Sequence, residues 1–102
     1  MSKPRVDLQR ILEDIVGAKH VYFQPPDGLK IEYPAIIYKL NDIENVSADN
    51  LVYTQKNAYQ ITVIDQNPDS EISKRVSKLQ SCQMMSAYSS DRLNHFVYNL
   101  YF

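Results

Sequence analysis

Ala58-Tyr-Gln-Ile-Thr-Val-Ile-Asp-Gln-Asn-Pro-Asp-Ser-Glu-Ile72 is the stretch that decides the fold. In its first half, Tyr59, Ile61 and Val63 alternate with Gln, Thr and Ile. A period of two among β-branched and aromatic residues is typical of a strand with one face set for burial. The sequence therefore predicts a central strand here, on which the other elements pack.

The second half of the stretch predicts a turn that leads into a helix. The alternation breaks at Asp65, and Asn-Pro-Asp-Ser follows at 67–70. Asn67 is suited to cap a helix and Pro68 to occupy its first position, while acidic residues favour the positive end of the helix dipole. We expect this helix near residues 68–80. Its buried face would carry Ile72, Val76 and Leu79.

Outward from this unit, the chain predicts one more helix and four more strands. Apolar residues spaced by three, four, seven and eight predict a helix at 4–16, and Gly17 follows it as a stop. Runs of β-branched and aromatic residues, interrupted by Pro, Gly and polar turns, predict the strands. These are expected at 20–24, 35–40, 82–88 and 93–102.

The order of elements, α-β-β-β-α-β-β, indicates the fold class. It predicts an α+β fold in a single domain, residues 1–102, with a mostly antiparallel β-sheet and two helices packed on one face. The last strand carries apolar residues on both faces. Because both helices lie on one side, the other face of the sheet would lack a cover within the chain. A partly apolar, tyrosine-rich outer face indicates that another chain covers it.

The segment 41–52 connects two predicted antiparallel strands and is polar, rich in Asn and Asp, and without a clear period. A connection of this length is long for a compact domain, and such loops are often functional. We expect either a protruding hairpin that contacts a partner or a solvated tip.

Composition and charge exclude several classes of protein. The chain has 102 residues, a net charge of −1 and scattered Lys and Arg, so no general attraction to nucleic acid or anionic membrane is predicted. Cys82 is the only cysteine, which excludes an intrachain disulfide, and we expect it to be a small core residue. The first residues show no apolar signal region and no apolar run approaches membrane-spanning length, so we expect synthesis in the cytosol.

Patterns for catalysis are weak. The two glycines stand in different turns, so no phosphate-binding loop is predicted. His20 and His95 have no carboxylate at ligand-like spacing. Asp65, Asp69 and Glu71 form one close acidic group, which leaves a small host enzyme or metal-dependent nuclease as an alternative. We predict no catalytic residue, no metal site and no cofactor, and we do not expect an enzyme.

Eight tyrosines occur in the chain, with no tryptophan. Tyrosine buries a large area at low entropy cost and keeps a polar tip, which suits interfaces, but it is also a good strand residue. We therefore expect Tyr38, Tyr59 and either Tyr98 or Tyr101 to be interface or core aromatics.

Four segments carry a further pattern. They are His-Val-Tyr-Phe-Gln-Pro-Pro at 20–26, Tyr-Pro-Ala-Ile-Ile-Tyr-Lys-Leu at 33–40, Tyr-Gln-Ile-Thr-Val-Ile-Asp with Asn-Pro-Asp-Ser-Glu-Ile within 59–72, and Leu-Asn-His-Phe-Val-Tyr-Asn-Leu-Tyr-Phe at 93–102. Together they resemble small tail components of long-tailed bacteriophages and prophages, most closely the tail terminator, or tail-to-head joining, family. The resemblance runs over nearly the whole chain.

The resemblance implies a structural virion protein at the tail–neck junction, made in the bacterial host cytoplasm. Such a protein would form a homo-oligomeric ring, expected to be a hexamer, that caps the tail tube, stops its polymerisation and joins the tail to the head connector. Its partners would be other copies of itself, the tail tube protein and head connector or stopper proteins. DNA could pass through the ring without sequence-specific binding, and no membrane contact is expected.

The expected subunit or tail-tube interface combines the polar connection with the tyrosines. Its residues are Asp42, Ile43, Glu44, Asn45, Val46, Ser47, Asp49, Asn50, Tyr38, Tyr59, Tyr98 and Tyr101. An alternative role is another neck component, such as a head-completion or stopper protein, or a minor tail protein.

Overall fold

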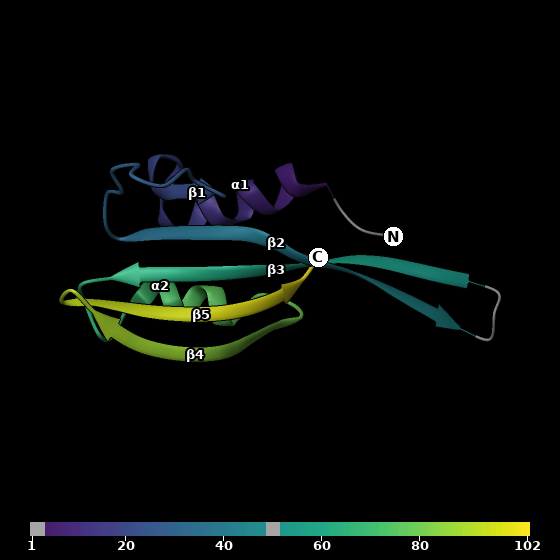
Figure 1. Cartoon of the computed structure of the whole chain (residues 1–102). Coiled ribbons are helices and arrows are strands. Elements are labelled where there is room, and N and C mark those ends of the chain that lie inside the picture. The colour runs from purple at the N-terminus through teal and green to yellow at the C-terminus, as the bar shows by residue number, and fades with distance from the viewer. Residues whose placement is uncertain (1–3, 49–51) are drawn as a thin grey trace.

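Five strands form one sheet, in the order β1-β2-β3-β5-β4, in the computed structural model of the chain (Figure 1). The structure describes residues 4–48 and 52–102, and the side chains within 4–41 and 57–102. β1 runs parallel to β2, and every other neighbouring pair is antiparallel. The elements are α1 (Arg5–Val16), the short 3₁₀-helix η1 (Ala18–His20), β1 (Val21–Phe23), β2 (Ala35–Ala48), β3 (Val52–Asp65), α2 (Glu71–Ser77), β4 (Cys82–Ser90) and β5 (Leu93–Tyr101).

α1 confirms the helix predicted at 4–16. Pro4 is extended at its start, and Leu8 and Leu12 are buried one turn apart on its inner face. Gly17 ends the helix with a φ of 107°, a value that side chains rarely tolerate, and its N–H donates to the Glu13 carbonyl at 2.7 Å. The apolar spacing and the glycine stop therefore act as the sequence predicts.

α2 is shorter than predicted and begins later. The predicted cap, Asn67, instead accepts the Asp69 N–H at 2.9 Å in a local turn, and Pro68 lies in that turn rather than in the helix. Ser70 is the cap, since its hydroxyl accepts the Ser73 N–H at 3.2 Å. Val76 is buried as predicted.

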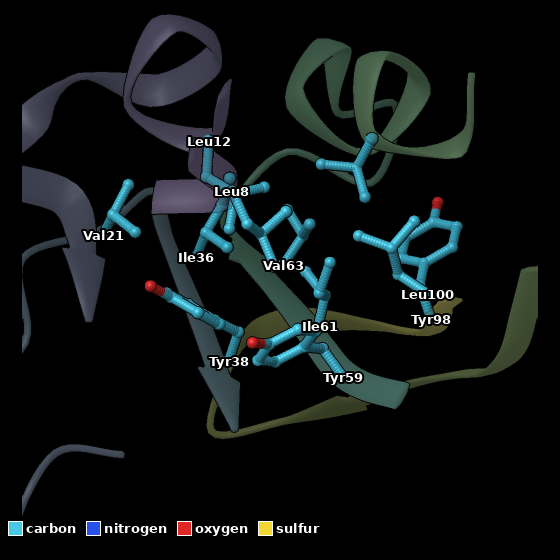
Figure 2. Packing of buried hydrophobic residues seen from close by; sticks show 11 residues of the cluster. Leu8, Leu12, Val21, Ile36, Tyr38, Tyr59, Ile61, Val63, Tyr98 and Leu100 are labelled. Carbon is cyan, nitrogen blue, oxygen red and sulfur yellow. The ribbon is translucent and has the colours of Figure 1, made fainter. Parts of the chain in front are cut away.

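The core lies between the sheet and the two helices, which cover the same face (Figure 2). The alternation predicted in β3 is confirmed: Tyr59, Ile61 and Val63 are buried on the helix side. On β5, Tyr98 and Leu100 share that side. The predicted α+β fold, with two helices on one face of a mostly antiparallel sheet, is therefore confirmed.

β4 and β5 form a tight hairpin at one edge of this sheet. Ser90 and Leu93 lie opposite each other, and the two residues between them, Asp91 and Arg92, have φ values of 54° and 65°. Two positive φ values are typical of the type I′ turn, which matches the twist of the flanking strands. An extra residue, Met85, interrupts the register between Met84 and Ser86 as a bulge.

Candidate assembly surface

The segment predicted as a long connection, 41–52, consists mostly of paired strand. The ladder between β2 and β3 runs without interruption from Asp42 opposite Ala58 to Ala48 opposite Val52. The prediction of an irregular connection is therefore wrong, and its protruding-hairpin form is correct. Of the predicted interface residues, Asp42 to Ser47 lie on β2, whereas Asp49 and Asn50 lie outside the described residues.

This hairpin extends beyond the rest of the sheet as a two-stranded arm, residues 42–57 (Figure 1). β1 pairs only with Ile36, Ile37 and Tyr38 of β2, and β5 reaches β3 only from Ala58 onward. Within the described part of the chain, the two strands of the arm therefore pair only with each other, except at the base, where the Asn57 carbonyl accepts the Phe102 N–H at 2.9 Å. The molecule is elongated as a result, with extents of 49 × 24 × 22 Å.

A bulge marks the base of the arm. Leu40 pairs with Tyr59 and Asp42 with Ala58, so Asn41 is an extra residue on β2. A bulge bends its strand and increases the local twist. In Figure 1 the arm twists away from the plane of the sheet at this point. The bulge therefore redirects the arm away from the core.

Three of the four predicted interface tyrosines are core residues. Tyr38, Tyr59 and Tyr98 are 0%, 2% and 1% exposed, and their rings lie under the helices (Figure 2). Tyr101 is half-buried at the end of β5, opposite Ala58 at the base of the arm. The expectation of a tyrosine-rich outer face is wrong, because the alternation of β2, β3 and β5 places these three rings on the helix side.

The buried hydroxyl of Tyr38 is satisfied by the first helix. It donates to Gln9 Oε1 and accepts from Arg5 Nη1 at 2.8 Å, while the Arg5 guanidinium lies 4.4 Å from the centre of the Phe23 ring. Burial raises the pKa of the Tyr38 hydroxyl, and the Arg5 hydrogen bond offsets part of that rise. Tyr38 therefore fastens α1 to the sheet and presents no group to a partner.

Tyr98 has the same role toward the second helix. Its hydroxyl lies 2.5 Å from Ser73 Oγ and donates to the Ser73 carbonyl at 3.1 Å. Because a tyrosine hydroxyl has a single proton, Ser73 Oγ is then the donor of the shorter bond.

The face of the sheet opposite the helices mixes polar and apolar side chains. Ile37, Gln60, Thr62 and Val97 are half-buried there. An open groove of about 560 Å³ lies near the base of the arm. It is lined by Gln24, Pro25, Ile37, Tyr38, Lys39, Leu40, Gln60 and Thr62.

The strongest surface feature is β4, which sequence reasoning did not single out. It is the last strand of the sheet, and all its residues from Gln83 to Ser90 are exposed. Met84, Met85 and Tyr88 are 48%, 60% and 53% exposed. The nine residues of β4 include no charge and no proline. That composition was a usable signal, because natural edge strands normally carry charges or proline against unwanted pairing.

Tyr88 also covers a histidine on the outer face. Its ring stacks on His95 at 4.7 Å between centroids and 7° between planes. Among the described residues, no hydrogen-bond partner reaches the buried Nδ1 of His95. The His95 ring thus contributes packing at the β4–β5 edge.

The acidic group considered for a metal site does not gather around a common point. The Asp65 carboxylate accepts the Asn67 N–H at 3.0 Å, and Glu71 Oε1 lies 3.5 Å from Lys74 Nζ. In the part of the chain that the structure describes, no group of three or more His, Cys, Asp or Glu residues is arranged to hold a metal ion. These carboxylates belong to turns and helix ends, so the nuclease alternative has no site to support it.

Cys82 lies at the start of β4, partly buried against the core. Burial raises the pKa of its thiol to about 11. The thiol is thus poorly ionised at neutral pH, as expected of a small packing residue. Among the described helices, none has the length and apolar character needed to cross a membrane.

Comparisons of the sequence with known proteins give no match. Neither the protein-family models nor the curated proteins include one that matches this chain.

Proposed function

We propose that this protein is a structural assembly protein that terminates a phage tail tube and joins the tail to the head. The observation that carries an assembly function is the arm, residues 42–57, a ribbon that beyond its base at Asn57 pairs only with itself among the described residues. A two-stranded ribbon on its own is marginally stable in water and exposes unpaired N–H and C=O groups along both sides. Such a ribbon gains stability when another chain lies against it.

The reach of the arm suits docking to a neighbouring subunit or ring. The ladder from the pair Asp42–Ala58 at the base of the arm to the pair Ala48–Val52 spans roughly 20 Å at the usual rise of a strand. Among the described side chains, the buried cluster lies between the sheet and the helices, so we expect the core to form without the arm. An extension of this kind is available for contact with a partner, as a docking element requires.

The role in a phage tail is the finer part of the proposal, and the sequence resemblance supports it. In that role, copies of the chain form a ring, expected to be a hexamer, at the end of the tail tube. The arm contacts the last tube ring or a neighbouring subunit, and the opposite side of the ring meets the head connector. A head-completion or stopper protein would share the fold and the arm but would bind heads instead of tubes.

The test uses a variant in which residues 44–56 are replaced by Asn-Gly, a pair that suits a two-residue hairpin. Because Ile43 pairs with Asn57, this change shortens both strands of the arm equally. We expect unchanged cooperative unfolding and loss of binding to purified tail tubes of the virus that encodes the chain. The exposed-loop variant Leu29→Ser is the control, since Leu29 is 46% exposed and lies outside the arm.

Cosedimentation with tail tubes and with portal-bearing heads, measured in parallel, decides between the roles. Binding of the intact chain to tubes supports the terminator role, and binding to heads alone supports the stopper role. If the shortened variant binds tubes as tightly as the intact chain, the arm is not the docking element.

A further inference from the structure

The outer edge of β4 carries neither the charges nor the proline that commonly keep edge strands from pairing, although the bulge at Met85 interrupts its ladder with β5. Its N–H and C=O groups face outward at the end of the sheet, and in the described chain no strand pairs with that side. Charges, proline or a covering element usually block such an edge. β4 contains no charged residue and no proline, and its residues from Gln83 to Ser90 are exposed. An extended strand from another chain can therefore add to the sheet here.

The chain itself contains a strand edge that matches. On the arm, residues 42–48 of β2 pair with β3 on one side, and their other side lies beyond the reach of β1. That edge is of a length comparable to β4. It also lies on the opposite side of the sheet from β4, given the order β1-β2-β3-β5-β4. Successive copies related by a modest rotation bring opposite edges together, which is the geometry of a head-to-tail contact.

The use of both free edges favours this pairing over two alternatives between copies. Two copies paired through their arms would leave both β4 edges open. The sequence of the β2 edge of the arm includes the acidic residues Asp42 and Glu44. β4 is uncharged and places no such charge opposite them. Two copies paired through β4 alone would leave both arms without a partner, whereas arm-to-β4 pairing uses both free edges in one contact.

We propose that the outer edge of β4 receives the β2 edge of the arm, residues 42–48, from a second copy of this chain. The contact deepens, and rests on, the proposed assembly function. It covers the exposed apolar side chains of Met84, Met85 and Tyr88. Because the donor and acceptor edges differ, each copy can both give and receive a strand, so the contact builds a ring or a filament rather than a closed pair.

The first variant removes a hydrogen-bond donor from the outer edge and leaves the internal ladder intact. Ser90 and Leu93 close the two-residue turn, so alternate residues counted back from Ser90 face β5. Ala87 then directs its N–H outward, and Ala87→Pro deletes that donor at a position where an edge strand tolerates proline. A second variant, Met85→Lys, places a charge on the edge without changing the backbone. Its matched control is Leu29→Lys, at an exposed apolar residue outside the edge.

Light scattering and sedimentation velocity over a concentration series measure self-association, and thermal unfolding checks that each variant is folded. We expect the intact chain and Leu29→Lys to assemble equally. Ala87→Pro and Met85→Lys should each raise the concentration for half-assembly by about tenfold or more, the effect of losing one or two edge contacts.

A mixing experiment identifies the two halves of the contact. The arm-shortened chain keeps the β4 acceptor, and Ala87→Pro keeps the arm donor. At a concentration where the intact chain assembles and each variant alone is monomeric, their mixture should form a heterodimer that grows no further. Self-association of the arm-shortened chain would overturn the proposal in favour of β4–β4 pairing, and absence of the heterodimer would overturn it directly. An intact chain that stays monomeric yet binds tail tubes would overturn the strand contact and leave the proposed function standing.

Discussion

The hydrogen bonds between Tyr98 and Ser73 allow a quantitative test of how α2 is held on the sheet. α2 has seven residues, too few to be stable as an isolated helix, so tertiary contacts must fix it. Val76 supplies the buried apolar contact, and Tyr98 supplies two polar ones, to Ser73 Oγ and to the Ser73 carbonyl. Both side chains are nearly inaccessible to water, with Tyr98 1% and Ser73 5% exposed.

The two single substitutions should differ in cost. Tyr98→Phe removes both hydrogen bonds and leaves the Ser73 hydroxyl buried without its partner, so we expect a loss of about 2–3 kcal/mol in the free energy of unfolding. Ser73→Ala removes one bond, while the Tyr98 hydroxyl can still donate to the backbone carbonyl. That change should cost about 0.5–1.5 kcal/mol.

The double variant carries the decisive information. Removing both hydroxyls leaves no buried serine hydroxyl unpaired, so its cost should be close to that of Tyr98→Phe alone. The double-mutant cycle then gives a coupling of about 1 kcal/mol or more. Tyr33→Phe is the matched control, because Tyr33 is 40% exposed and its substitution should change stability by less than about 0.5 kcal/mol.

Urea unfolding followed by far-ultraviolet circular dichroism measures all four variants, with the slope of the transition as a check on two-state behaviour. Strictly additive costs, or a Tyr98→Phe variant as stable as the parent, would refute the reasoning. Either result would mean that Val76 and the neighbouring apolar contacts hold α2 without the tyrosine.

Two further predictions concern the core. Leu12→Ala should lower the free energy of unfolding, measured in urea, by about 2–5 kcal/mol, because Leu12 on α1 is fully buried against the sheet. Val6→Ala, at a residue that is 49% exposed, should be near neutral. Equal costs would contradict the assigned inner face of α1. The thiol of Cys82 has a pKa of about 11 in place of the ordinary 9.0, so at pH 8 it should react with a disulfide reagent about a hundredfold more slowly in the folded than in the urea-unfolded chain. The reaction rate of the folded chain should rise with pH until about pH 11. Equal rates in the two states would show that burial does not suppress the thiolate.

The elements with a buried face were predictable from the sequence. In β3 and β5 the alternation of large apolar residues with smaller or polar ones assigns the helix side, and the structure agrees at Tyr59, Ile61 and Tyr98. In α1, apolar spacing and the glycine stop fix both face and end. A period signals burial on one side, so these signals are strong wherever an element packs against the core.

The start of α2 was not predictable with the same accuracy because several residues compete to cap it. Asn67, Asp69 and Ser70 can each accept a backbone N–H, and the sequence does not rank them. In the structure, Asn67 makes a local turn and Ser70 caps the helix. The competing turn therefore displaced the predicted helix start by about one turn.

The arm was missed as regular structure for a physical reason. Its strands extend beyond the part of the sheet that the helices cover (Figure 1), where packing on the helices does not require the alternation by which strands are recognised. The sequence at 41–52 looks like an irregular loop, although residues 42–48 and Val52 are paired in the ladder between β2 and β3. The same reasoning applies to β4, whose exposed residues do not alternate but whose lack of charge is itself informative.

These two misses point to the same property of the molecule. Burial within the monomer limits which residues a position can hold. β4 is exposed, and the arm extends beyond the part of the sheet that the helices cover, so burial limits the choice of residues less in these two elements. Leaving β4 uncharged nonetheless carries a cost, because an open edge invites aggregation. A single lysine would have removed that risk without disturbing the core. The absence of charge and proline on β4, beside an arm with a free edge, supports the proposal that another strand lies against β4. We propose the arm of a second copy for that strand, because its outer edge is also unpaired among the described residues.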